Sequence, residues 1–127
     1  MGTFRHPVEV GDPSGQRYER VEALVDTGAT FSVFPASQLQ SLGVTPFDRE
    51  RLIIGDGSQI EVGLGRTWVR VNGKSELTIV VFGNESLVPL LGAYALEGLR
   101  LAVDPINKRL IPIQGLFPSL MDPTQFR

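Results

Sequence analysis

One stretch of the sequence joins an apolar segment to a carboxylate, a hydroxyl and a glycine. Leu24 and Val25 are followed directly by Asp26, Thr27 and Gly28. A carboxylate at the end of a buried strand costs free energy unless it is hydrogen-bonded or paired, so its presence there needs a reason. The glycine lets the backbone turn sharply and bring N–H groups near the carboxylate oxygens. This pattern makes Asp26 a candidate for acid–base chemistry.

The simplest interpretation of this triplet is an Asx-type turn that closes a hairpin, because Asp and Gly are the commonest turn residues. The surrounding sequence favours another interpretation. An apolar segment at 31–34 follows the turn directly. More than sixty residues later comes a second apolar segment that ends in glycine, Leu90-Leu91-Gly92.

Together these motifs resemble the retropepsin family of aspartic proteases, which includes retroviral proteases and their single-domain cellular and bacterial relatives. In that family an apolar strand leads into Asp-Thr-Gly-Ala. A later apolar-apolar-Gly strand passes through the active-site loop and precedes a short helix. Residues 24–29, 90–92 and 93–97 match in order and spacing. The resemblance spans about residues 3–113 and leaves 114–127 as a C-terminal tail.

The resemblance implies an all-β fold: a closed retropepsin-like acid-protease β-barrel with one or two short helices, active as a symmetric homodimer. The whole chain, residues 1–127, is then one domain of the bacterial or cellular branch. Asp26 would be the catalytic carboxylate. Thr27 would bond across to the partner chain, and the carbonyl of Gly28 would contact an extended peptide substrate.

Peptide hydrolysis of this kind uses two carboxylates about 3 Å apart that share one proton. The chain contains a single Asp-Thr-Gly. The second carboxylate is therefore expected from Asp26 of an identical chain on a two-fold axis. Such an aspartic endopeptidase activates water directly, so no metal and no cofactor are expected.

The resemblance also predicts which residues contact the substrate. Residues 52–62 correspond by position to the family's flap, a hairpin that closes over bound peptide, although a plain hairpin with a Gly-Asp-Gly turn is the alternative. Glycine at its tip lets the backbone change conformation and approach the substrate. Many viral members have an acidic residue, which helps to hold the substrate backbone, at the position that Thr30 occupies here. The predicted contacts are Ala29, Thr30, Ile54, Gly55, Asp56, Gly57, Ser58 and Leu91.

Alternation of apolar and polar residues predicts most of the other elements. It indicates strands at 4–10, 21–25, 52–54, 60–64, 67–71, 77–82, 99–103 and 109–113. Helix-start and helix-end signals predict short helices at 35–42, which begins with proline, and at 93–97, which precedes Gly98. His6 and Trp68 are expected to be packing residues.

Composition limits the partners. The 127 residues include no cysteine and one histidine, which excludes thiol nucleophiles, disulfides and His clusters. The net charge of -2 is spread along the chain, so nucleic acid is not an expected partner. No apolar run approaches the roughly 20 residues of a membrane helix, so no membrane association is expected. The N-terminus lacks a secretory pattern, which predicts a cytoplasmic protein.

Two alternatives to a protease stay open at this point. One is a catalytically silent retropepsin-like dimer that acts as a binding or assembly module. The other is an unrelated small β-barrel in which Asp-Thr-Gly is coincidental. The second alternative leaves Leu90-Leu91-Gly92 without a role.

Overall fold

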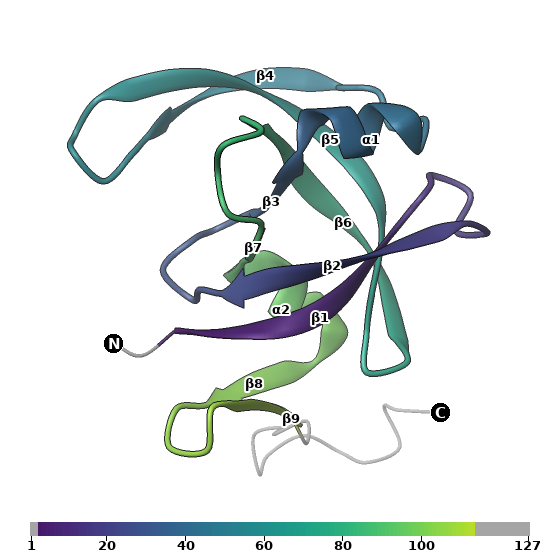
Figure 1. Ribbon diagram of the computed structural model, residues 1–127, viewed down its shortest axis with the longest axis vertical. Helices are drawn as coiled ribbons and strands as arrows, with labels where there is room; N and C mark the ends of the chain where they lie inside the picture. Colours follow the sequence, from purple (N-terminus) through teal and green to yellow (C-terminus); the bar gives the residue numbers. More distant parts are fainter. Residues whose placement is uncertain (1–2, 114–127) are drawn as a thin grey trace, which may run out of the picture.

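The computed structural model describes residues 3–113, and strands dominate it (Figure 1). The two helices are short: α1 (Ala36–Ser41) and α2 (Ala93–Leu99). The strands are β1 (Phe4–Gly11), β2 (Tyr18–Val25), β3 (Ser32–Pro35), β4 (Asp48–Ile53), β5 (Gln59–Val71), β6 (Lys74–Gly83), β7 (Leu90–Leu91), β8 (Leu101–Asp104) and β9 (Arg109–Pro112). Residues 3–113 are thus all-β with two short helices, as predicted. The tail at 114–127 lies outside the described residues.

Seven strands form one sheet in the order β1-β2-β7-β3-β6-β5-β4. Strand β1 also pairs with β5 through Glu9–Arg70 and Val10–Val69. The first strand of this order is therefore also hydrogen-bonded to the sixth. Strands β8 and β9 form a separate two-stranded sheet below the main one in Figure 1.

The two-residue strand β7 lies between β2 and β3. It runs parallel to β2, with Leu24 opposite Leu90 and Val25 opposite Leu91, and antiparallel to β3. Strands β2 and β3 therefore do not pair with each other. The interpretation of Asp26-Thr27-Gly28 as the turn of a hairpin is wrong, because a distant segment occupies the position where the second hairpin strand would lie.

Alternating side chains divide between two apolar clusters. The larger contains Val8, Val10, Phe34 and Leu91, each 0% exposed, and is covered by both helices through Leu39 and Leu99. The smaller consists of Val62, Leu64 and Val81, with five partly buried residues packed on it from β3 to β6 and the loop before β3. Burying one face of each strand explains why period-2 patterning predicted most of these elements.

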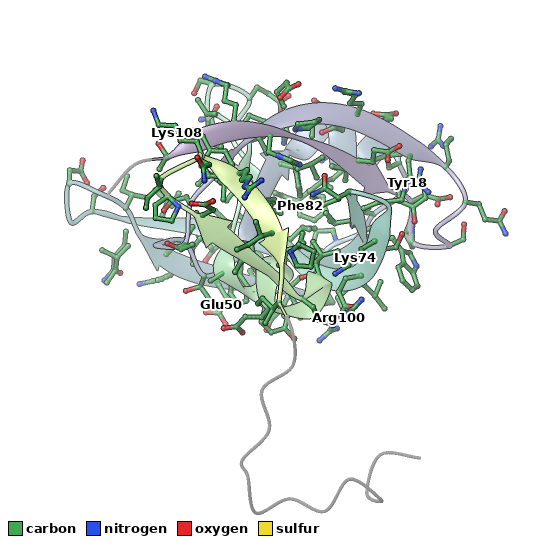
Figure 2. All side chains as sticks on the ribbon, turned by 90° about the horizontal axis from the view of Figure 1, so that it is seen from below. Tyr18, Glu50, Lys74, Phe82, Arg100 and Lys108 are labelled. Carbon is green, nitrogen blue, oxygen red and sulfur yellow. The ribbon has the colours of Figure 1, made fainter. Side chains whose placement is uncertain are left out.

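Strand β5 is longer than expected, since the predicted strands at 60–64 and 67–71 are one continuous strand. Gly63 and Gly65 are buried inside this strand and make room for neighbouring side chains. A Cβ atom on Gly65 would lie 2.9 Å from Phe82 Cε1 and 2.9 Å from Val44 Cγ1. Figure 2 shows Phe82 near the middle of the molecule, whereas Tyr18 and Glu50 lie toward its periphery.

The junction after α2 also differs from the prediction. The helix continues through Gly98 to Leu99, so the strand predicted at 99–103 begins only at Leu101. Gly98 leaves room for Glu76, which packs over it: a Cβ atom at position 98 would lie 2.7 Å from Glu76 Cγ. Arg100, at φ 58°, ends the helix in the left-handed conformation.

Within residues 3–113, neither helix has the length or hydrophobicity to cross a bilayer.

Candidate active site

Asp26 is the first residue after β2 and is held by its backbone and its side chain. Its N–H donates to the carbonyl of Leu91 (3.0 Å), and its carbonyl accepts from the N–H of Ala29 (3.2 Å). Its Oδ1 accepts from the N–H of Gly28 (2.9 Å). The Asx-type bond expected of this triplet is therefore present, but it fixes a half-buried carboxylate beside β7.

We call residues 26–31 the active-site loop. Helix α2 is bonded to it end-on: Ala93 N–H donates to Ala29 O (2.8 Å), and Tyr94 N–H donates to Thr30 O (2.9 Å). The first N–H groups of a helix have no partner within the helix. Here the loop carbonyls satisfy two of them, which couples the loop to α2.

Gly92 allows this close approach. A Cβ atom at this position would lie 2.7 Å from the carbonyl carbon and oxygen of Phe31 and 2.8 Å from the carbonyl oxygen of Ala29. The N–H of Gly92 donates to the hydroxyl of fully buried Ser32 (3.0 Å). The glycine of Leu90-Leu91-Gly92 is thus required by contact with the active-site loop.

An open groove of about 1180 Å³ runs past Asp26. Most of its lining is apolar and comes from β3, β6, the β4–β5 hairpin and the loop before β7. The lining residues are Asp26, Gly28, Ala29, Thr30, Phe31, Val33, Arg51, Leu52, Ile53, Ile54, Gly55, Ile60, Glu61, Val62, Val81, Phe82, Gly83, Asn84, Leu87, Val88 and Leu90. A carboxylate beside an apolar groove suits a peptide with apolar side chains.

The β4–β5 hairpin arches over the side of the molecule that carries the active-site loop (Figure 1). Its tip is closed by Ile54 N–H to Ser58 O (2.9 Å) and Gly57 N–H to Ile54 O (2.8 Å). Asp56 Oδ1 accepts from both the N–H (2.8 Å) and the hydroxyl (2.5 Å) of Ser58. The hydroxyl bond first, and the backbone bond second, lower the pKa of Asp56 below its usual value. Gly57 has φ +86°, a conformation that favours glycine.

Six of the residues predicted from sequence line the groove: Asp26, Gly28, Ala29, Thr30, Ile54 and Gly55. Thr27, Asp56, Gly57 and Ser58 are exposed but are not part of the lining. Leu91 is 0% exposed in the larger apolar cluster. The predicted substrate contact of the Leu91 side chain does not fit this burial, because parity along β7 turns Leu90 toward the groove and Leu91 toward the core.

Several lining residues were not predicted as site residues. They include Phe31 and Val33 after the triplet, Phe82 on β6, and Leu87 and Val88 before β7. Their apolar character was only a weak signal of a binding groove, since apolar residues in strands are normally core residues. The unusual exposure of Leu87 (48%) and Val88 (42%) appears only in the folded chain.

Charged groups in the groove come mainly from the β4–β5 hairpin. Glu61 pairs across the hairpin with Arg49, whose Nε lies 2.9 Å from Glu61 Oε1. Arg51 lies opposite Glu61 in the strand pairing and lines the groove. Over residues 3–113, no three His, Cys, Asp or Glu side chains cluster in a way that could hold a metal ion.

Solved protease structures share this fold. The protease of simian foamy virus (mac) matches with a TM-score of 0.53 at 17% identity, covering 74% of this chain and 92% of its own. The EIAV protease matches with a TM-score of 0.53 at 20% identity, covering 77% of this chain and 88% of its own. A retropepsin-like aspartic protease from Rickettsia conorii matches with a TM-score of 0.52 at 18% identity, covering 81% of this chain and 88% of its own. At these identities the likeness establishes the fold.

This fold, with an Asp-Thr-Gly loop beside a groove, is that of a retropepsin-like aspartic protease. The model of a family described as aspartyl protease matches residues 7–93, which is more than half of the chain. The chain belongs to this aspartyl protease family, and the protein is accordingly a hydrolase of the aspartic protease class. Because the chain belongs to this family, the alternative of an unrelated small β-barrel is wrong. None of the curated proteins matches the sequence.

Proposed function

We propose that the protein is an aspartic endopeptidase that cleaves extended peptides in a groove completed by two copies of the chain. The observation that carries the proposal is the position of Asp26. Its carboxylate lies at the end of β2, held by Gly28 N–H, and lines a largely apolar groove. One chain supplies one such carboxylate.

In the proposed reaction, Asp26 of each chain faces its counterpart across a two-fold axis. Two carboxylates at hydrogen-bonding distance share a proton because both cannot be charged together. The ionised member takes a proton from a bridging water as the water attacks the peptide carbonyl carbon. The protonated member gives its proton to the carbonyl oxygen. Thr27 would bond to the partner chain, and the Gly28 carbonyl would accept a hydrogen bond from the substrate backbone.

The homodimer also accounts for the open groove. Each chain would supply one half of the substrate channel, in a sheet that we take to be a closed barrel through the β1–β5 pairing. The β4–β5 hairpin would act as the flap, with Gly55 beside the substrate and Asp56, Gly57 and Ser58 shaping the tip. Closing it would exclude bulk water from the groove while the attacking water stays between the two carboxylates.

The lining favours apolar substrate side chains. Groove residues such as Val33, Leu52, Ile54 and Phe82 offer apolar surface and only a few charges. Burial of apolar area contributes about 25 cal/mol per Å², so a peptide with bulky apolar residues near the scissile bond should bind best. The natural substrate is therefore expected to be a flexible apolar segment of a protein.

The test is digestion of a peptide library by the wild type and by Asp26→Asn, followed by mass spectrometry. Asparagine is nearly isosteric and can still accept the Gly28 N–H bond, so the fold and the dimer should persist. It cannot act as a base, so cleavage should fall by at least about 100-fold. Sedimentation of both proteins measures the dimer.

Two outcomes would contradict the proposal. Cleavage that persists in Asp26→Asn would remove the aspartate from the reaction. A stable, folded dimer that cleaves no peptide at any pH from 3 to 8 would favour the silent binding module instead.

A further inference from the structure

One wall of the groove is formed by the loop between β6 and β7, which we call the wall loop (residues 84–89). Asn84, Leu87 and Val88 line the groove. The side chains of Leu87 and Val88 remain 48% and 42% exposed. Their apolar surface is available to a bound peptide, but it provides little packing to hold the loop in place.

The two ends of the wall loop are fixed by the sheet. At one end, Gly83 is paired with Pro35 of β3. At the other, the carbonyl of Pro89 accepts from Leu24 N–H (2.8 Å).

The middle of the wall loop is organised by bonds within the loop. Leu87 N–H donates to Asn84 O (3.0 Å), and Asn84 Oδ1 accepts from both the N–H and the hydroxyl of Ser86 (3.0 Å each). These bonds fix the shape of the turn. They do not fix its position relative to the groove.

Glu85 connects the middle of the wall loop to a different element. Its Oε2 accepts from the N–H of Ser37 in α1 (3.2 Å), and its Oε1 accepts from the Ser37 hydroxyl. The hydroxyl bond is the main reason that the pKa of Glu85 lies below its usual value, so the side chain is a carboxylate at neutral pH. Hydrogen bonds to an ionised acceptor are stronger than neutral ones.

We propose that Glu85 is a positioning residue for substrate binding: by bonding to Ser37 it holds Leu87 and Val88 against the groove. The inference rests on the proposed function. Helix α1 is a suitable anchor because Leu39 fixes it in the core. Glu85 itself does not line the groove and acts through the loop. Without it, binding a peptide would include the cost of ordering the wall loop.

The experiment compares kinetics of Glu85→Ala, Glu85→Gln and Ser37→Ala, using a cleavable peptide chosen from the library. Glu85→Ala should raise KM about three- to tenfold while kcat stays within about twofold, because uniform binding is lost and the chemical groups are untouched. Glu85→Gln should be intermediate, because its amide oxygen can still accept one bond. Combining Ser37→Ala with Glu85→Ala should add little to the single change.

The matched control is Glu22→Ala, which removes an exposed glutamate that forms a long ion pair with Arg20, at 3.8 Å. It should leave KM unchanged. Amide hydrogen exchange gives a readout that does not depend on catalysis: Leu87 N–H should exchange faster in Glu85→Ala than in the control. A purely structural role for Glu85 would lower the melting temperature without changing KM.

An unchanged KM and unchanged Leu87 exchange in Glu85→Ala would overturn this inference while leaving the protease intact. If the wild type cleaves nothing, the proposed function fails instead. The inference is then decided by calorimetric binding of a peptide with a hydroxyethylene group in place of the scissile bond. Equal affinity for wild type and Glu85→Ala would overturn it, and weaker binding by the variant would support it.

Discussion

The active-site loop and the β4–β5 hairpin face the same groove but are held in opposite ways. The loop is bonded to residues about sixty positions away, through pairs such as Asp26 with Leu91 and Ala29 with Ala93. The tip of the hairpin is bonded to itself, by Ile54 with Ser58 and by Asp56 with Ser58. Long-range bonds fix the backbone that carries Asp26, whereas the hairpin tip is held by local bonds.

Glycines make the same contrast visible. A Cβ on Gly92 would collide with the backbone of Phe31 at 2.7 Å, whereas a Cβ on Gly55 would meet nothing within 4 Å. In the loop region, glycine serves close packing. At the hairpin tip, no neighbouring atom requires glycine at position 55.

The largest expected effect comes from testing these two glycines. Gly92→Ala should destabilise the protein by about 2–3 kcal/mol, because backbone atoms must move to admit the methyl group. Gly55→Ala, the matched control, should change the free energy of unfolding by less than about 0.5 kcal/mol. Urea unfolding followed by circular dichroism measures both. Equal stability of the two variants would mean that the loop region is not tightly packed.

A smaller effect is expected from binding of an uncleavable peptide analogue. Amides at 52–62 should gain protection from hydrogen exchange, because the hairpin becomes ordered over the ligand. Amides at 24–32 should change much less, since they are already bonded to β7 and α2. Exchange read by mass spectrometry separates the segments. If both segments gained equal protection, the assignment of the hairpin as a flap would be wrong.

The smallest effect concerns acid and the hairpin tip. The folded pKa of Asp56 is lowered by Ser58, so the carboxylate stabilises the turn above the ordinary aspartate pKa. That contribution is lost as pH falls through the folded pKa of Asp56, which lies below the ordinary value of 3.8. The Ser58 amide should therefore exchange relatively faster in acid. Asp56→Asn should abolish this pH dependence in NMR measurements. An identical pH profile in the variant would assign the effect to another group.

Much of the fold could be predicted because its strands bury one face. Alternation at Val8 and Val10, and at Ala23 and Val25, corresponds to side chains 0–3% exposed. The first four residues of β4 could not be predicted in this way, because residues 48–51 are exposed and show no alternation. The packing role of Gly63 and Gly65 could not be predicted for a related reason: they accommodate Phe82, and no local pattern records this neighbour.

The candidate site likewise contains residues that could be predicted from the sequence and residues that could not. Asp26 and Gly28 carry a local signal, since a carboxylate and a glycine interrupt an apolar strand. Leu91 was assigned to the substrate by its motif, but strand parity decides that Leu90 lines the groove. The contribution of Leu87 and Val88 depends on where the wall loop lies in the folded chain.

The position of β7 also determines when the active-site loop can form during synthesis. Strands β1 and β2 can pair as a hairpin as soon as they are made, but the bonds from Leu24 and Asp26 wait for Pro89 and Leu91. Contacts this far apart in sequence form late, after the chain entropy of a long loop has been lost. A nascent chain that has not reached β7 thus carries Asp26 without the bonds that orient it. The order of synthesis itself keeps the growing polypeptide from completing the active-site loop before residues 89–94 have been made.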